Sequence, residues 1–222
     1  MDIKAILSEI KAELPQTTQL VAVSKFHPAE AIKEAYDAGQ RIFGESKVQE
    51  LEEKHTVLPQ NIEWHFIGHL QTNKVKYIAP YISMIHAVDS YKLLAEINKQ
   101  AAKADRVIPC LLEIHIAKEE TKFGFTPEEC TEMLNEGSWK ELKNVCISGI
   151  MGMATNTDDD AMIESEFTKL AAYFNELKST FFKDCNSFKE LSMGMSDDYH
   201  LAIKHGSTLV RIGSKIFGMR NY

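Results

Sequence analysis

Eight short apolar runs alternate with stretches of helical pattern along the chain, and this alternation is the feature that most restricts the possible folds. Their spacing averages about 28 residues, typical of units made of one strand and one helix. The runs are apolar throughout rather than at every second residue, as in parallel sheets that helices cover on both faces. The eight runs are 20–24, 41–45, 63–68, 83–89, 107–116, 145–153, 188–195 and 208–218.

Eight strands in strict alternation with helices favour a closed (β/α)8 barrel, and an open Rossmann-like sheet is the alternative. One more amphipathic helix precedes the first run, with Ile3, Leu7, Ile10 and Leu14 on one side. The 222 residues contain no linker rich in Gly, Ser or Pro and no shift in composition. We therefore predict one α/β domain, residues 1–222, folded as a TIM barrel with an extra N-terminal helix.

Charge and composition exclude several classes of partner. The formal net charge is −7, from 25 Lys and Arg against 32 Asp and Glu. A net acidic surface repels phosphate backbones, so we expect no nucleic-acid partner. No run has the roughly 18 apolar residues of a membrane span, and the N-terminus lacks the pattern of a signal peptide. The four cysteines lie far apart in the sequence and form no C-x-x-C motif, which is typical of reduced thiols: Cys110, Cys130, Cys146 and Cys185. We expect a cytoplasmic protein that does not bind membranes.

Lys25 directly follows the first apolar run, where a barrel strand would end. Functional groups of such barrels come from the carboxyl ends of the strands. Desolvation there lowers the pKa of a lysine amine, which can then form a Schiff base with an aldehyde. A surface lysine with its charged end in water explains the same sequence, and position alone leaves both interpretations open.

Two segments with Gly and Ser, expected to form loops where the seventh and eighth strands end, overlap the seventh and eighth runs. The first reads Ser192-Met193-Gly194-Met195-Ser196, and the second contains Gly213 and Ser214. Glycine permits close approach to the backbone, while hydroxyl and N–H groups donate to an anion. The loops after strands seven and eight are a frequent phosphate site in this fold. Ordinary turns use the same residue types, but two such loops at this place favour phosphate binding.

Arg211 lies within the otherwise apolar eighth run, where a buried guanidinium needs a partner. It either donates to a ring nitrogen or anion of a ligand, or pairs with Glu45 or Glu113, and the residues leave both open. His65 and His69 are four residues apart, but the glutamate of a zinc-binding helix is missing, so we expect no metal site.

The sequence resembles the pyridoxal 5′-phosphate homeostasis proteins, a family whose fold matches the N-terminal barrel domain of alanine racemase. The resemblance runs from Val21 to Tyr222 and rests on seven ordered motifs. These are VAVSK (21–25), DAGQRIFGE (37–45), EWHFIGHLQTNK (63–74), IAKEETKFGF (116–125), GIMGMAT (149–155), LSMGMSDDYHLAI (191–203) and GSTLVRIGSKIFGMR (206–220).

The resemblance implies a barrel of PLP fold type III, in which Lys25 holds pyridoxal 5′-phosphate (PLP) as a Schiff base. It also implies that Arg211 corresponds to the arginine that meets the pyridine nitrogen in the related racemase domain. Four residues would bind the phosphate, the first through its side chain and the others through the backbone: Ser196, Met195, Gly213 and Ser214.

An arginine beside the ring nitrogen disfavours protonation of that nitrogen, because a guanidinium stays charged and accepts no hydrogen bond. The ring is then a poorer electron sink. A racemase also needs a second base, which alanine racemase takes from a separate β-domain, whereas this sequence stops at Tyr222. We therefore expect a monomer that binds PLP and serves PLP homeostasis, with PLP-dependent apo-enzymes as candidate recipients and no catalytic residues.

Two other functions stay open. One is a PLP-dependent amino-acid racemase or decarboxylase with weak activity, with Tyr222 or another residue near the pocket as base, and the other is a cofactor-free Schiff-base aldolase. The chain also departs from the family. It has Ser46-Lys47 where Asn-Tyr is usual, which leaves a contact from Ser46 open, and His27 where a second lysine is frequent. Lys122 is another amine that could receive or pass on the aldehyde.

Overall fold

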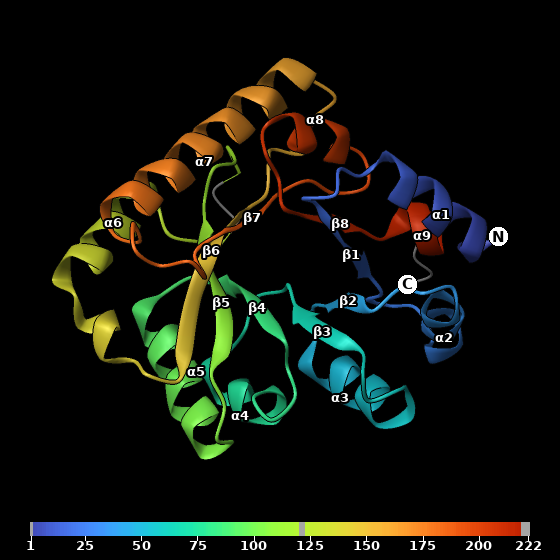
Figure 1. The fold of residues 1–222 in the computed structure, drawn as a ribbon, viewed down its shortest axis with the longest axis horizontal. Helices are drawn as coiled ribbons and strands as arrows, with labels where there is room; N and C mark the ends of the chain where they lie inside the picture. The colour runs from blue at the N-terminus through green and yellow to red at the C-terminus, as the bar shows by residue number, and fades with distance from the viewer. Residues whose placement is uncertain (1, 120–122, 219–222) are drawn as a thin grey trace.

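The computed structural model describes residues 2–119 and 123–218, and in them eight parallel strands close into a barrel (Figure 1). Each strand pairs with the next in sequence, and β8 pairs with β1 to close the ring. The predicted (β/α)8 barrel is confirmed, and the alternative of an open sheet is wrong. The strands are β1 (Gln19–Val23), β2 (Ile42–Glu45), β3 (Glu63–Phe66), β4 (Met84–Val88), β5 (Ile108–Ile114), β6 (Val145–Gly152), β7 (Glu190–Ser192) and β8 (Leu209–Ile212).

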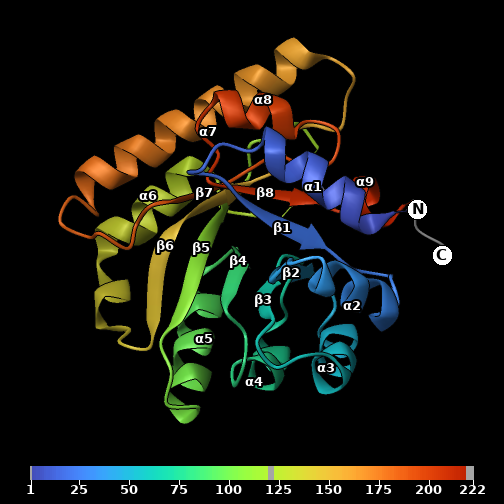
Figure 2. The ribbon, with the colours of Figure 1, turned by 45° about the vertical axis from the view of Figure 1, so that its right-hand side comes forward.

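Helices surround the barrel on its outer side (Figure 2). Their start signals are those of the sequence: Thr126 and Glu129 form a capping box, and Asp159 accepts from the N–H groups of Ala161 and Met162. The helices are α1 (Ile3–Glu13), α2 (Ala29–Asp37), α3 (Val48–Val57), α4 (Val75–Ile78), α5 (Tyr91–Lys103), α6 (Pro127–Glu136), α7 (Asp160–Thr180), α8 (Tyr199–Lys204) and α9 (Ser214–Phe217), with 3-10 turns at Thr72–Lys74 and Ser138–Glu141.

The last apolar run is shorter as a strand than the sequence predicts. It was expected to continue to residue 218, but β8 ends at Ile212, which pairs with Ala22 near the end of β1. β1 itself ends only one residue later, at Val23, so little of a neighbouring strand remains for β8 to pair with. The chain turns into α9 instead, where the N–H groups of Ile216 and Phe217 donate to the Gly213 carbonyl at 2.9 Å.

The hydrophobic core has two parts. The larger one fills the layer between barrel and helices, as parallel sheets covered by helices require. The smaller one lies inside the barrel and consists of Val21, Leu111, Met151 and Leu209. Polar side chains occupy the rest of the barrel interior and form the candidate site.

The N-terminal helix covers the barrel beside its last elements. Its expected apolar side is buried through Ile3, Leu7 and Ile10. Both views place α1 beside α9 (Figures 1 and 2), and the Tyr199 hydroxyl of α8 donates to Glu13 at 2.5 Å. No helix in the described ranges has both the length and the apolar character needed to cross a membrane.

Candidate functional site

Lys25 lies half-buried in a sharp turn directly after β1. Phe26 has a φ of 66°, a left-handed conformation that is rare without glycine. Its N–H donates to Glu50 Oε1 at 2.5 Å, and the His27 N–H donates to the Ser24 carbonyl at 3.1 Å. These bonds hold the backbone on both sides of Lys25, so the turn gives this lysine a defined position at the carboxyl end of the barrel.

A buried ionic cluster supports this turn. Lys54 Nζ of α3 donates to the Ser24 carbonyl at 2.8 Å, to Glu45 Oε1 at 2.7 Å and to Glu50 Oε1 at 2.6 Å. The side chains of Lys54 and Glu45 are 7% and 0% exposed. Burial raises the pKa of Glu45 to about 7, and the nearby Lys54 opposes that rise. The cluster joins β1, β2 and α3 at the residue before Lys25.

Arg211 points into the barrel and belongs to a row of buried polar side chains. Its Nη1 donates to Ser192 Oγ at 2.6 Å and its Nη2 to the Gly152 carbonyl at 3.1 Å. Ser192 Oγ lies 3.0 Å from His86 Nδ1, and His86 Nε2 lies 2.9 Å from His65 Nδ1. One arrangement of hydrogen atoms fits all three contacts: Arg211 donates to Ser192, Ser192 donates to His86, and His86 donates to His65.

Burial leaves Arg211 as the one charged side chain among these four residues. It lowers the pKa of His65 to about 3 and that of His86 well below the usual value, so both imidazoles are neutral at pH 7. Burial also lowers the pKa of Arg211 to about 10, which leaves the guanidinium charged at pH 7. Of the two interpretations of Arg211, the ion pair with Glu45 or Glu113 is wrong within the described residues, because no such pair forms there.

Glu113 faces the same space without completing its hydrogen bonds. Its side chain is 4% exposed, and Oε2 has no hydrogen-bond partner among the described residues. Burial, followed by the charge of Asp89, raises the pKa of Glu113 to about 7, and Arg211 opposes this rise. A buried carboxyl oxygen without a partner is costly unless a ligand supplies one.

The two loops predicted to bind phosphate contact each other at the carboxyl end of the barrel. The Gly213 N–H donates to Ser196 Oγ at 3.2 Å, and the Met195 N–H donates to Asp198 Oδ1 at 2.5 Å. Ser214 is exposed at the start of α9. A hollow of about 330 Å³ lies beside these loops, lined by residues 153–158 after β6 and by Met195 and Asp198 after β7.

The turn at Lys25 and the loop at Gly213 lie against each other. A Cβ on Gly213 would lie 2.9 Å from the Val23 carbonyl oxygen and 3.1 Å from Val23 Cβ, so only glycine fits there without a shift. Val23 is two residues before Lys25, and Gly213 is two residues after Arg211. The structure thus gathers the six residues predicted for the site at one end of the barrel: Lys25, Met195, Ser196, Arg211, Gly213 and Ser214.

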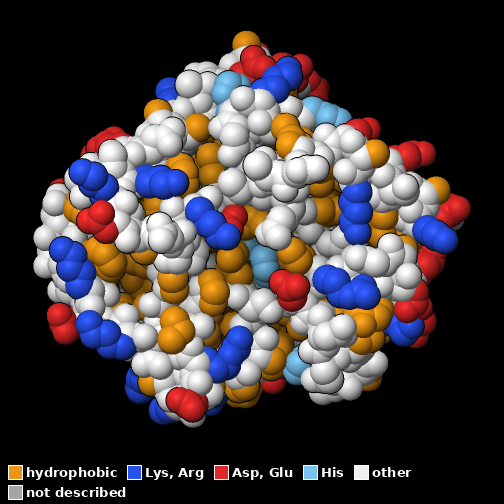
Figure 3. Space-filling model, in the orientation of Figure 1, with side chains coloured by type: hydrophobic (Ala, Val, Ile, Leu, Met, Phe, Trp, Pro, Cys, Tyr) orange, Lys and Arg blue, Asp and Glu red, His pale blue; other side chains and the backbone are white. Residues whose placement is uncertain are grey.

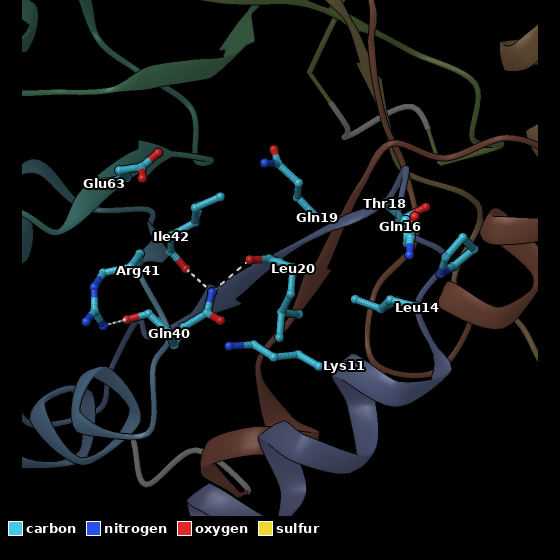
Figure 4. A pocket seen from close by; sticks show the side chains of 11 residues that line it. Lys11, Leu14, Gln16, Thr18, Gln19, Leu20, Gln40, Arg41, Ile42 and Glu63 are labelled. Carbon is cyan, nitrogen blue, oxygen red and sulfur yellow. Dashed lines mark hydrogen bonds between the residues drawn. The ribbon is translucent and has the colours of Figure 1, made fainter.

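A separate pocket lies at the opposite, amino-terminal end of the strands (Figure 4). It has a volume of about 410 Å³ and is lined by residues of α1 and by the first residues of β1, β2 and β3, among them Lys11 and Arg41. Gln40 donates to the carbonyls of Leu20 and Ile42 there, which ties β1 to β2. In (β/α)8 barrels this end serves stability, so we do not assign the site to it.

Other candidates from the sequence are separated. His65 lies inside the barrel, whereas His69 is half-exposed and lies 3.0 Å from Asp89. The described residues contain no group of three His, Cys, Asp or Glu placed to hold a metal ion. Ser46 lines a hollow with Lys47, apart from the loops at Ser196. Lys122 and Tyr222 lie outside the described residues.

Sequence reasoning missed the row from Ser192 to His65 and the cluster around Lys54. The signal for the row is a polar residue inside an apolar strand, which occurs at His65, His86 and Ser192. Reading each such residue by its alternation with inward apolar neighbours would have placed them in the barrel. Nothing comparable marks Lys54, because a lysine on a helix is usually at the surface.

Comparisons with known proteins agree in family and fold. The sequence profile described as "Alanine racemase, N-terminal domain" matches residues 2–221. The "Pyridoxal phosphate homeostasis protein" of Haemophilus influenzae is 40% identical over 209 residues, which is 93% of this chain and 86% of that protein.

Solved structures give the same result. PipY of Synechococcus elongatus PCC7942 without PLP superposes with a TM-score of 0.90 at 36% identity, over 97% of this chain and 100% of that one. The structure of PipY with PLP bound gives 0.88 at 35% identity over the same shares. Alanine racemase of Clostridium difficile 630 shares the fold, with a TM-score of 0.75 at 16% identity over 100% of this chain and 56% of that one.

Proposed function

This chain belongs to the family of the pyridoxal phosphate homeostasis proteins, and from that premise we propose that it binds PLP and carries it for homeostasis rather than catalysing a reaction. The observation that carries the proposal is the gathering of a lysine, a buried arginine and two Ser/Gly loops at one end of the barrel. A relative of the same fold, PipY, has been solved with PLP bound.

The residues at this end fit PLP in charge and hydrogen bonding. PLP carries a phosphate, a ring nitrogen and an aldehyde. The glycine at 213 lets its loop lie directly against Val23 at the end of β1, and the loops offer the hydroxyl groups of Ser196 and Ser214 as donors. The N–H groups of Met195 and Gly213 donate to Asp198 and Ser196 in this structure, so they would have to turn toward a bound phosphate. The carboxyl oxygen Oε2 of Glu113, which has no partner among the described residues, and the buried guanidinium of Arg211 face the barrel interior beside these loops. A polar ligand bound there would supply hydrogen-bond partners to both groups.

We assign the residues as follows. Lys25 supplies the amine that holds the aldehyde of PLP, and Arg211 meets the ring nitrogen. Ser196 and the backbone of Met195, Gly213 and Ser214 bind the phosphate. When bound, PLP would supply an aldehyde that reacts reversibly with amines, and this reversibility suits a carrier.

Arg211 also argues for carriage over catalysis. A charged guanidinium has no acceptor, so it keeps a proton off the ring nitrogen and limits withdrawal of electrons. Arg211 is held by a hydrogen bond to Ser192, and Ser192 in turn is hydrogen-bonded to the neutral His86. The groups assigned to the ring therefore favour holding PLP over activating it for catalysis, and none of the described residues is assigned as a catalytic base.

Location and partners belong to the proposal as well. We place the protein, a single domain, in the cytoplasm as a monomer, with PLP-dependent apo-enzymes as recipients and no nucleic acid. The net charge of −7 and four free cysteines support this assignment. Lys and Arg side chains are spread over the face in Figure 3 and do not form one stripe that could follow a nucleic-acid backbone.

The test is to add PLP to the purified chain, reduce with borohydride and map the labelled peptide. We expect an absorption band at a longer wavelength than the absorption of the protein itself, and a reduced adduct on Lys25. Both should be lost in Lys25→Ala. Lys47→Ala, which removes an exposed lysine nearby, should keep both. An adduct elsewhere would overturn the site.

The same preparation separates carrier from enzyme. A carrier returns PLP to an apo-form of a PLP-dependent enzyme and leaves L- and D-amino acids unchanged. Turnover of any amino acid that disappears in Lys25→Ala would instead establish the racemase or decarboxylase alternative.

A further inference from the structure

Cys146 and Cys185 share one serine hydroxyl, although they are far apart in sequence. Cys146 Sγ donates to Ser187 Oγ at 3.2 Å, and Cys185 Sγ lies 3.0 Å from the same oxygen. The two sulfur atoms therefore lie no farther apart than the sum of these two distances. Both cysteines are half-buried, so a small reagent in solution has access to them.

The backbone around the pair can bring the sulfurs together. Cys146 is the second residue of β6, and Cys185 lies in the irregular loop between α7 and β7. The two segments run side by side, because the Lys189 N–H donates to the Ser148 carbonyl at 2.9 Å and β6 pairs with β7. The strand fixes the sulfur of Cys146. The loop at Cys185, held by short-range backbone bonds to Phe182 and Phe188 and not by a sheet, would have to shift to bring its sulfur to the bond length of about 2 Å that a disulfide needs.

We propose that Cys146 and Cys185 form a redox-sensitive pair that closes to an intramolecular disulfide when it meets a low-molecular-weight disulfide such as oxidised glutathione. The pair lies at the amino-terminal end of β6 and β7, away from Lys25. The inference therefore does not depend on the proposed function. In a reducing compartment such a bond is transient, as in redox-sensing proteins.

The exchange balances without another reactant. One cysteine loses its proton, and its thiolate attacks a sulfur of oxidised glutathione and releases one glutathione thiolate. The thiolate of the second cysteine then attacks the protein sulfur of this mixed disulfide and releases the other. Two protein thiols are oxidised, one glutathione disulfide is reduced to two thiols, and Ser187 loses both sulfur partners.

The other two cysteines serve as internal controls. Cys110 and Cys130 are fully buried, and burial raises the pKa of both thiols, that of Cys130 to about 11. Only a small fraction of each thiol is ionised at neutral pH, and no reagent reaches either one in the folded chain. Cys110 lies close enough to Cys146 to raise its own pKa further, so a bond between these two is the competing outcome.

The experiment uses the unmodified full chain in glutathione buffers of stepped ratio, followed by alkylation of free thiols, digestion and peptide mapping. We expect the intact mass to fall by two hydrogen atoms, one linked peptide pair that joins Cys146 to Cys185, and alkylation of Cys110 and Cys130 only after unfolding. Because the bond encloses α7, the melting temperature of the oxidised chain should rise by about 5 °C.

Two variants sharpen the result. Cys146→Ser should replace the linked pair by a mixed disulfide of glutathione on Cys185, whereas Cys130→Ser should keep the link. A link to Cys110, a dimer joined by a disulfide, or two glutathione adducts without a link would overturn the proposal. The mapping of the unmodified chain decides the question even if a variant fails to fold.

Discussion

Arg211 Nη1 donates a 2.6 Å hydrogen bond to Ser192 Oγ, so a neutral hydroxyl on β7 holds the guanidinium of β8. A carboxylate partner would pull the guanidinium away from any ligand, whereas a hydroxyl leaves its charge available. Ser192 passes the hydrogen bond on to His86, which burial keeps neutral. The orientation of Arg211 thus depends on side chains of several strands.

Replacing Ser192 by alanine should leave Arg211 and His86 with unmet hydrogen bonds inside the barrel. We expect the free energy of unfolding to fall by about 2 kcal/mol. Urea denaturation measures this loss. Ser179→Ala, at an exposed position on α7, should change stability by less than about 0.5 kcal/mol. Equal effects of the two substitutions would show that the row does not stabilise the barrel.

Lys54→Met should break the cluster under the turn at Lys25. It leaves Glu45 fully buried without its cation, at a cost of about 3 kcal/mol where Glu45 is ionised. Because the pKa of Glu45 is about 7, the loss should be larger at pH 8 than at pH 6. Denaturation at both pH values measures the difference.

The control for Lys54 is Lys33→Met, which removes a half-exposed pair with Asp37. Its cost should stay below about 0.5 kcal/mol at either pH. The Lys54 variant should also bind PLP more weakly, since Nζ holds the Ser24 carbonyl next to Lys25. If Lys54→Met changed neither the stability nor the affinity for PLP, the cluster around Lys54 would not support the turn at Lys25.

The sequence predicts the barrel well because the barrel depends on repeated local signals. Apolar runs, helix caps and their alternation give eight strands and the capping box at Thr126. The end of β8 was missed, since it is set by where β1 stops and not by the residues 213–218 themselves. A strand needs a neighbour, and sequence periodicity does not show where that neighbour ends.

The candidate site divides in the same way. Lys25 and the segments at Ser196 and Gly213 could be predicted as candidates because a lysine after an apolar run and Gly and Ser near the end of one are local features. The partners of Arg211 were not, because Ser192 and Gly152 come from other strands and meet it only in the closed barrel. Long-range polar pairing depends on register, which a single sequence leaves open.

Glu113 should make stability depend on pH. Burial raises its folded pKa from 4.5 to about 7, with Asp89 adding to the rise and Arg211 opposing it. The folded state then binds more protons than the unfolded state between these values, so the free energy of unfolding falls as pH rises from about 4.5 to about 7. The loss is on the order of 3 kcal/mol.

Glu113→Gln should remove the part of the pH dependence that comes from Glu113, because glutamine does not titrate, whereas the part from Glu45 remains in both chains. Stability of the variant and the parent chain, measured by urea denaturation from pH 4.5 to 8, should be most alike at pH 4.5 and diverge most at pH 8, where the parent chain has lost the stability that Glu113 contributes at low pH. Glu132→Gln, at an exposed position on α6, should follow the parent curve. Parallel curves for Glu113→Gln and the parent would contradict the assignment of the raised pKa to Glu113.

Ser196→Ala tests the phosphate assignment by comparing two probes that differ only in the phosphate. Ser196 Oγ accepts from the Gly213 N–H, and its own O–H remains to donate to an anion. Losing one donor to a charged group costs about 1.4 kcal/mol or more, so the Kd for PLP should rise at least about tenfold. The Kd for pyridoxal, which has the aldehyde and ring but no phosphate, should stay within about twofold of the parent value, because Lys25 and Arg211 are unchanged. Ser8→Ala, at an exposed position on α1, should alter neither constant. An equal loss of affinity for both probes would mean that Ser196 acts by holding the Gly213 loop in place, and the phosphate would then have to bind elsewhere.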